Sequence, residues 1–213
     1  PIEFTLGKPT ERQFGISDGF LMQGNKKLMA ICELKLPQRH NHQNFLAALA
    51  MGSILKLPMD SMCETLKNFS GLEHRCQLVN IMNGVAYYND SKATNVGAAI
   101  AAIESMGHTL KGKLILLAGG DSKDAPLEPL QIPIKKFVSH VILFGKDADL
   151  LETALKSVTH IIRVNNLREA IVEAQKIAKP NDVVLLAPAC ASLDQYENYA
   201  ARGRDFVDAV LSL

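Results

Sequence analysis

The sequence predicts an α/β protein built on a mostly parallel, doubly wound sheet, and three apolar runs are the main reason. Each run breaks off into a turn of small and polar residues, at 89–95 (NDSKATN), 119–123 (GGDSK) and 188–195 (PACASLDQ). If the three runs are strands of one parallel sheet, their turns meet at its carboxyl edge, where open α/β sheets bind ligands. We therefore expect the functional site along that edge.

The second half of the chain alternates short apolar strands with amphipathic helices. It opens with a hairpin, because Gln77–Met82 and Val85–Asn89 flank Asn83-Gly84, a dipeptide suited to a two-residue turn. The elements expected after it are helix 95–106, strand 114–118, strand 141–144, helix 147–155, strand 161–164, helix 167–178, strand 183–187 and a last helix that begins at Ser192. This order predicts a Rossmann-like sheet with helices on both faces and an antiparallel hairpin at one edge.

The first 70 residues are expected to form a smaller α/β segment. An antiparallel meander should cover 14–34, followed by a helix capped by Asn41 and a short second helix over 59–66. The residues expected on the buried face of the first helix are Phe45, Leu46, Leu49, Ile54 and Leu57. A domain boundary is expected at the end of this segment, which gives domains 1–70 and 71–213.

Composition and charge exclude several classes of protein. The net charge is +1, which gives no sign of a nucleic-acid or membrane partner. The four cysteines form no C-x-x-C pair and no ligand-spaced cluster with the six histidines, so we expect reduced thiols and no metal site. No run approaches ~20 apolar residues and no signal peptide is visible, which predicts a cytoplasmic protein without membrane insertion. The chain begins without methionine in strand-like sequence, which predicts a fragment of a longer protein.

Ser192 has two interpretations. It stands where the last helix should begin, and Gln195 lies three residues on, as in a capping box. The same helix N-terminus would carry free N–H groups and a partial positive charge that favour an anion. Capping is the commoner role for such a serine, whereas the small residues at 188–191 favour a ligand that approaches the backbone.

Charged and polar residues at the other turns also have two interpretations. Lys123 follows two glycines and is either a solvated surface lysine or a cation beside a loop that a ligand can approach. Asp90, Lys92 and Thr94 occupy alternate positions and could face one side of their turn. The alternative is a surface ion pair, with Thr94 as the cap of the next helix.

Three further residues are candidates for nucleotide contacts. Asn41 and Asn44 are either a cap and a first-turn residue or amides that recognise adenine. Arg75 is either a surface arginine or a phosphate ligand at the domain junction. Residues 107–113 (GHTLKGK) imitate a phosphate loop, but they precede a strand, and Leu114 stands where a metal-binding Ser or Thr belongs. The chain therefore has no phosphate loop of its own.

The turn motifs, together with two others, resemble those of the Mur ligases. They are HNHQN at 40–44, GLEHR at 71–75, NDSKATN at 89–95, LLAGGDSK at 116–123 and LLAPACASLDQY at 185–196. The resemblance covers the chain from about His40 to its end, and it is specific because several independent motifs agree in sequence order. Within the family it points to the branch that adds D-glutamate.

The resemblance implies a three-domain enzyme. One domain binds the UDP end of the substrate, a central domain carries the phosphate loop, and the third binds the incoming amino acid and closes over ATP. Residues 1–70 would be the end of the central ATP-binding domain, and 71–213 the amino-acid-binding domain. The phosphate loop, the magnesium ligands and a carbamylated lysine would all lie in the missing N-terminal half, so the fragment is expected to be inactive alone.

The resemblance also implies a reaction and its residues. ATP would phosphorylate the carboxylate of UDP-N-acetylmuramoyl-L-alanine, and the amine of D-glutamate would attack the acyl phosphate, in a step of peptidoglycan synthesis. The implied D-glutamate contacts are Lys123, Thr94, Ser192, Leu193 and Tyr199, the last standing where the family's D-glutamate enzyme has Phe. The implied nucleotide contacts are Asn41 and Asn44 at adenine, Arg75 at a phosphate, and Asp90 and Lys92 near the ribose and phosphates, where both would act in catalysis.

Two alternatives remain open. The first is another amino-acid ligase of the same superfamily, including the folate polyglutamate branch. The second is a non-enzymatic module that binds a nucleotide or an amino acid by itself, which would be favoured if the gene begins near Pro1.

Overall fold

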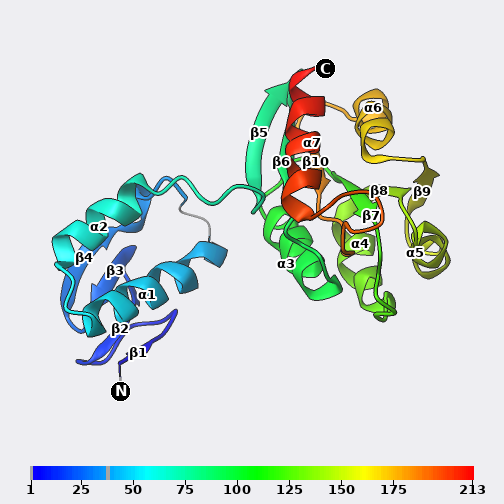
Figure 1. Ribbon diagram of the computed structural model, residues 1–213. Helices are drawn as coiled ribbons and strands as arrows, with labels where there is room; N and C mark the ends of the chain where they lie inside the picture. The colour runs from blue at the N-terminus through cyan, green and yellow to red at the C-terminus, as the bar shows by residue number, and fades with distance from the viewer. Residues whose placement is uncertain (1, 37–38) are drawn as a thin grey trace. The chain divides into compact units, whose positions relative to one another are not determined.

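The structure is a computed structural model that describes residues 2–36 and 39–213. The chain divides into two compact units, residues 1–71 and 72–213, which we call unit 1 and unit 2. The division lies one residue from the boundary expected after residue 70. Each unit has its own sheet and its own helices, labelled in Figure 1.

Unit 1 contains a four-stranded sheet in the order β1-β2-β3-β4. Its strands are Glu3–Phe4, Gln13–Ser17, Phe20–Gln23 and Lys26–Ala30. The last three pair antiparallel, as the meander predicted, and β1 pairs parallel with β2. The third meander strand ends at Ala30 rather than at Leu34, because a 3-10 turn over Ile31–Glu33 folds Leu34 into the core.

Two helices, α1 (Arg39–Ile54) and α2 (Met59–Asn68), pack on that sheet. Asn41 is not a cap, because the helix already begins at Arg39. Phe45, Leu46 and Leu49 are buried as expected, and the other two residues of the expected face are not. Ile54 is 62% exposed because it lies about half a turn around the helix from Phe45 at ~100° per residue. Leu57 is 50% exposed because the helix has ended before it.

Unit 2 contains a six-stranded sheet in the order β5-β6-β10-β7-β8-β9. The strands are β5 (Gln77–Met82), β6 (Val85–Asn89), β7 (Leu114–Gly119), β8 (Val138–Phe144), β9 (His160–Arg163) and β10 (Val183–Leu186). All neighbours are parallel except β5 and β6, which form the hairpin through Asn83 and Gly84, both at positive φ. The mostly parallel sheet with an antiparallel edge hairpin is confirmed.

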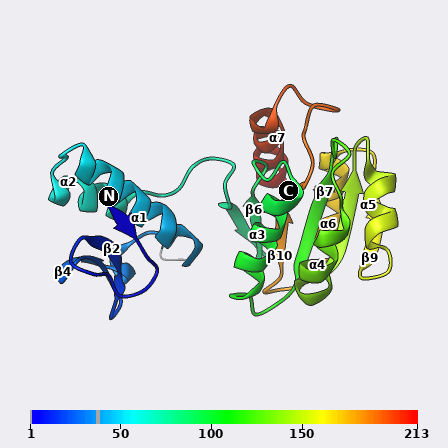
Figure 2. The same cartoon turned by 90° about the horizontal axis from the view of Figure 1, so that it is seen from below.

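Helices cover both faces of this sheet, as the alternation predicted. They are α3 (Val96–Gly107), α4 (Gln131–Phe137), α5 (Ala148–Leu155), α6 (Leu167–Ile177) and α7 (Tyr199–Leu211). Helices α3, α4 and α5 pack against one set of strand side chains, and α6 and α7 against the other, an arrangement that can be followed in Figures 1 and 2. Helix α4 was not predicted because Pro133 interrupts its pattern, although its first turn tolerates proline.

The start of the last helix was predicted wrongly. Helix α7 begins at Tyr199, and its cap is Asn198, whose side chain accepts the N–H of Ala201 at 2.9 Å. Ser192 instead begins a single turn, in which its carbonyl accepts the N–H of Tyr196 at 2.8 Å. Gln195 forms no capping box with Ser192, and its side-chain amide donates to the carbonyl of Asn165 at 2.9 Å.

The cap of α3 differs from expectation in the same way. Asn95, not Thr94, accepts the N–H of Ala98 at 2.9 Å. None of the helices in the described residues is long and apolar enough to span a bilayer.

Candidate functional site

The three predicted turns do come together at the carboxyl edge of the unit 2 sheet. They follow β6, β7 and β10, which are adjacent strands. Backbone hydrogen bonds join them beyond the strand ends: Asp90 N–H donates to Leu186 O at 2.8 Å, and Asp121 and Ala191 exchange a pair of bonds at 3.0 and 2.8 Å. The three loops therefore form one continuous surface.

A buried arginine that the sequence did not single out holds these loops together. Arg202 of α7 is completely buried, and its guanidinium donates to Ser91 O and Oγ, Cys190 O and Gly119 O at 3.0 to 3.3 Å. The three acceptor residues belong to different loops: Ser91 follows β6, Gly119 ends β7 and Cys190 follows β10. One side chain thus ties the three loops to α7.

The electrostatics of Arg202 follow from this burial. Removal from water lowers the pKa of its guanidinium to about 10, so the group is still charged at neutral pH. Its partners are carbonyl and hydroxyl oxygens rather than a carboxylate, so the positive charge is held by dipoles. The sequence offered one signal for this buried residue: Arg202 lies on the same helix face as the apolar Phe206 and Ala209.

Two glycines allow the β7 loop to approach its neighbours. Gly119 and Gly120 have φ of 144° and 122°, a region that L side chains rarely adopt. A Cβ atom at Gly119 would collide with the Phe144 carbonyl oxygen, and one at Gly120 with the Ala191 carbonyl oxygen. The pair is therefore required by the packing of the loop.

The β6 loop places its charged residues differently from a simple surface ion pair. The Asp90 carboxylate is nearly buried, and burial raises its pKa; the Cys76 thiol donates to it at 3.6 Å. Lys92 turns instead to Tyr199 on α7, with its Nζ 3.9 Å from the ring centroid. Thr94 is half-buried in the same loop.

The domain junction, residues 71–75, is hydrogen-bonded to the β6 loop through His74 and to Asn89 at the end of β6. Lys92 N–H donates to His74 O at 3.1 Å, and Asn89 Nδ2 lies 3.0 Å from His74 Nδ1 and 3.0 Å from Gly203 O. Asn89 Oδ1 accepts the N–H of Ser91, so its Nδ2 is the donor and His74 Nδ1 must accept. Burial lowers the pKa of His74, which favours this neutral ring. The neighbouring Arg75 side chain is exposed.

The remaining D-glutamate candidates lie on the β7 and β10 loops. Lys123 is exposed, and its backbone, at φ 53°, is held by an N–H bond to Asp121 Oδ1 at 2.9 Å. Ser192 is only 3% exposed, whereas Leu193 is 64% exposed. Because Ser192 begins no helix, the expected anion site at a helix N-terminus is wrong at this position.

Asn41 and Asn44 belong to unit 1, unlike the other candidates. They lie three residues apart on α1, which puts them on neighbouring positions of one helix face. Asn44 is exposed and Asn41 is half-buried.

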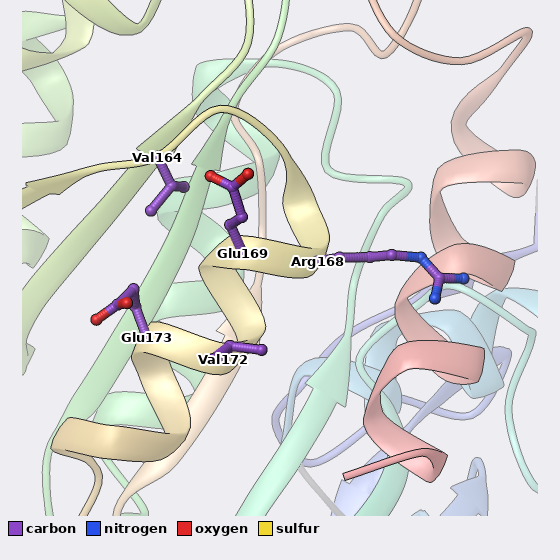
Figure 3. Close-up of a pocket in the computed structure, with 5 residues that line it drawn as sticks. All are labelled: Val164, Arg168, Glu169, Val172 and Glu173. Atoms are coloured by element: carbon purple, nitrogen blue, oxygen red, sulfur yellow. The ribbon is translucent and has the colours of Figure 1, made fainter.

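A shallow hollow elsewhere in unit 2 contains none of these candidates. It is lined by Val164, Arg168, Glu169, Val172 and Glu173, at the end of β9 and along α6 (Figure 3). Arg168 extends toward α7, where it binds Asp205 at 2.8 Å. In the part of the chain that the structure describes, no three His, Cys, Asp or Glu side chains are grouped to hold a metal ion.

Comparison with known proteins gives a family match. The model of the Mur ligase glutamate ligase domain matches residues 74–190, which include the β6 and β7 loops and the start of the β10 loop. It stops two residues before Ser192.

Relatives at high identity carry one name. The UDP-N-acetylmuramoylalanine–D-glutamate ligase of Pseudomonas fluorescens is 48% identical over 214 residues, which cover 99% of this chain and 48% of that protein. The ligase of the same name from Pseudomonas aeruginosa is 49% identical with the same coverage, and that of Coxiella burnetii is 50% identical over 188 residues. The chain spans about half the length of the curated relatives it matches.

Two solved structures with other names have a similar fold. A pseudomurein peptide ligase from Methanothermus fervidus matches with a TM-score of 0.66 at 18% identity, covering 96% of this chain and 42% of its own. A folylpolyglutamate synthase from Thermotoga maritima matches with a TM-score of 0.63 at 19% identity, covering 92% and 48%. At these identities the likeness concerns the fold.

Proposed function

Because the chain belongs to the Mur ligase family, we propose that it is part of an ATP-dependent ligase that adds D-glutamate to UDP-N-acetylmuramoyl-L-alanine in peptidoglycan synthesis. The observation that carries the proposal is the 48% identity to a D-glutamate ligase across 99% of the chain. The reaction would proceed in the cytoplasm through an acyl phosphate, which the amine of D-glutamate attacks. Unit 2 would hold the amino acid, and unit 1 would be the end of the central ATP-binding domain.

The β6, β7 and β10 loops would form the D-glutamate site. D-Glutamate brings two carboxylates, and the loops offer the Lys123 ammonium together with the hydroxyls of Thr94 and Ser192. These are suitable donors for carboxylate oxygens, and bonds to charged groups are stronger than neutral ones. Leu193 and Tyr199 would supply the apolar contact to the carbon chain. The small side chains before Ser192 would let a ligand approach the loop backbone.

The same edge would contact the nucleotide through cations. Arg75 is exposed and Lys92 is half-buried, and both suit phosphate oxygens. Lys92 would stabilise charge that develops on the transferred phosphoryl group, and Asp90 would lie near the ribose. Asn41 and Asn44 of unit 1 would contact adenine. Magnesium is expected with ATP in such ligases, and among the described residues no three His, Cys, Asp or Glu side chains are grouped to hold it.

An amino-acid panel tests this function directly. The complete protein, supplied with ATP and UDP-N-acetylmuramoyl-L-alanine, should release phosphate in the presence of D-glutamate and not of L-glutamate or L-alanine. A preference for another amino acid would favour a different ligase of the family. The 213-residue chain alone should neither release phosphate nor form product, because its sequence contains no phosphate loop. Phosphate release by the purified chain that depends on the UDP substrate would contradict this.

A further inference from the structure

One contact links the two proposed groups of binding residues, and the reaction scheme does not explain it. Lys92 Nζ lies 3.9 Å from the centroid of the Tyr199 ring. Lys92 is a proposed nucleotide contact, whereas Tyr199 is a proposed D-glutamate contact. We propose that Tyr199 is a positioning residue for Lys92, so that the amino-acid site and the nucleotide site are coupled through this ring. The inference rests on the proposed function.

The positions of the backbone place the Tyr199 ring beside Lys92, independently of the contact between the two side chains. Ser91, the residue before Lys92, donates its hydroxyl to Tyr199 O at 2.7 Å. Arg202 Nε donates to that same hydroxyl oxygen at 3.0 Å. Tyr199 is the first residue of α7, and the Asn198 cap fixes where that helix begins. The ring therefore has a defined place over the β6 loop.

The ring is also the main group that fixes the Lys92 ammonium. Within residues 2–36 and 39–213, no carboxylate forms an ion pair with Lys92. The nearby Asp90 carboxylate is directed to the Cys76 thiol instead. The negative face of an aromatic ring attracts a cation at this distance. His74 meets Tyr199 edge-on, with centroids 6.1 Å apart, which restricts rotation of the ring.

Such an arrangement predicts coupling with a measurable size. A contact of this kind at a partly exposed site changes an affinity by about two- to fivefold. If the ring positions Lys92 for a phosphate, removing the ring should weaken ATP use as well as D-glutamate use. Coupling of binding free energies is reciprocal, so D-glutamate should change the affinity for ATP by the same factor as ATP changes that for D-glutamate.

Steady-state kinetics of the complete protein test the coupling with Tyr199→Leu and Tyr199→Phe. Leucine keeps apolar contact but removes the ring, so the Michaelis constant for ATP should rise about two- to fivefold, along with that for D-glutamate. Phenylalanine restores the ring and should recover the ATP constant. The control is Lys123→Ala, which touches neither Lys92 nor Tyr199 and should raise the constant for D-glutamate while leaving that for ATP unchanged.

NMR of the 213-residue chain provides a readout that does not require activity. The ε-methylene protons of Lys92, assigned by their absence in Lys92→Arg, should be shifted upfield by the ring. The shift should disappear in Tyr199→Leu and remain in Tyr199→Phe. This measurement also covers the case in which the leucine variant folds poorly in the complete protein, because the phenylalanine variant and the unmodified chain already decide whether the contact forms.

The outcomes separate this inference from the proposed function. If Tyr199→Leu alters only the D-glutamate constant, or if Lys92 shows no ring-dependent shift, the positioning role is wrong and the proposed function survives. If neither Lys123→Ala nor Tyr199→Leu alters D-glutamate use, the proposed amino-acid site is wrong. A rise in both constants for Tyr199→Leu, recovered in Tyr199→Phe, supports the inference.

Discussion

The two units hold their candidate polar residues by different physical means. In unit 2 the candidates other than Tyr199 stand on loops, and buried polar side chains fix those loops: Arg202 binds three of them, and Asn89 joins His74 to α7. In unit 1, Asn41 and Asn44 stand on a regular helix, α1, which apolar packing through Phe45 and Leu46 holds in place. A loop site thus depends on a few buried hydrogen bonds, whereas a helix site depends on the core.

The largest expected effect comes from removing the Arg202 guanidinium, which joins the three loops of unit 2. Arg202→Met keeps the apolar stem but leaves the carbonyl oxygens of Ser91, Cys190 and Gly119 without their donor. Buried groups that lose a partner cost about 1–3 kcal/mol each, so the loss should reach about 3 kcal/mol or more, or ~10 °C in the melting temperature of unit 2. Differential scanning calorimetry of the 213-residue chain measures it.

The matched control for this variant lies two residues along the same helix. Arg204 is exposed, so Arg204→Met should change stability by no more than about 0.5 kcal/mol. The transition of unit 1 should be unchanged in both variants, since no hydrogen bond of Arg202 reaches it. Equal losses of stability in Arg202→Met and Arg204→Met would contradict a specific role of Arg202 in holding the loops. A shift in the unfolding transitions of both units would contradict a role confined to unit 2.

The next effect concerns ligand use rather than stability. In the complete protein, Lys123→Ala should weaken D-glutamate use about 10- to 150-fold, because it deletes a charge-assisted contact worth roughly 1.5 to 3 kcal/mol. Its melting temperature should not change, since the side chain is exposed and the loop is held by backbone and Asp121 contacts. The Michaelis constant is measured at saturating ATP and UDP substrate. Lys135→Ala, another exposed lysine, is the control, and a wild-type constant for Lys123→Ala would exclude the carboxylate contact.

The sequence predicted the sheet and the meeting of the loops, but not what holds them. The strands of the sheet and the edge at which the loops meet follow from periodicity and from the rule that parallel strands share a carboxyl edge, whereas the order of the strands was not predicted. The capping box at Ser192 failed because a four-residue pattern cannot show that Gln195 binds Asn165, far away in sequence. Arg202 was missed for the same reason, since its acceptors come from three distant segments. The apolar stripe of α7 indicates that Arg202 is buried, but it does not show which groups accept its hydrogen bonds.

A comparison of Asn198 with Ser192 separates helix capping from ligand binding. Asn198→Ala removes the side-chain cap of α7 and should cost about 1 kcal/mol, or ~3 °C in the melting temperature of unit 2. Ser192→Ala removes no cap and should leave the melting temperature nearly unchanged while it weakens D-glutamate use. A larger stability loss for Ser192→Ala than for Asn198→Ala would reverse the assignment.

The smallest expected effect is a pH dependence that starts at His74. Burial lowers its pKa below the ordinary 6.5, so the unfolded chain binds a proton more readily than the folded one. Stability should therefore be constant above about pH 6.5 and should fall as the pH is lowered through the range between the two pKa values. The structural reason is that a protonated Nδ1 cannot accept from Asn89 Nδ2.

NMR titration of the histidine Cε1 protons should give a midpoint for His74 below 6.5, with the proton of the neutral ring on Nε2. His74→Gln should make the decline in melting temperature between pH 7.5 and 5.5 less steep. A midpoint at or above 6.5, or a proton on Nδ1, would contradict the donation from Asn89 to this ring, and the Asn89 amide would then bind Gly203 of α7 without joining it to the junction.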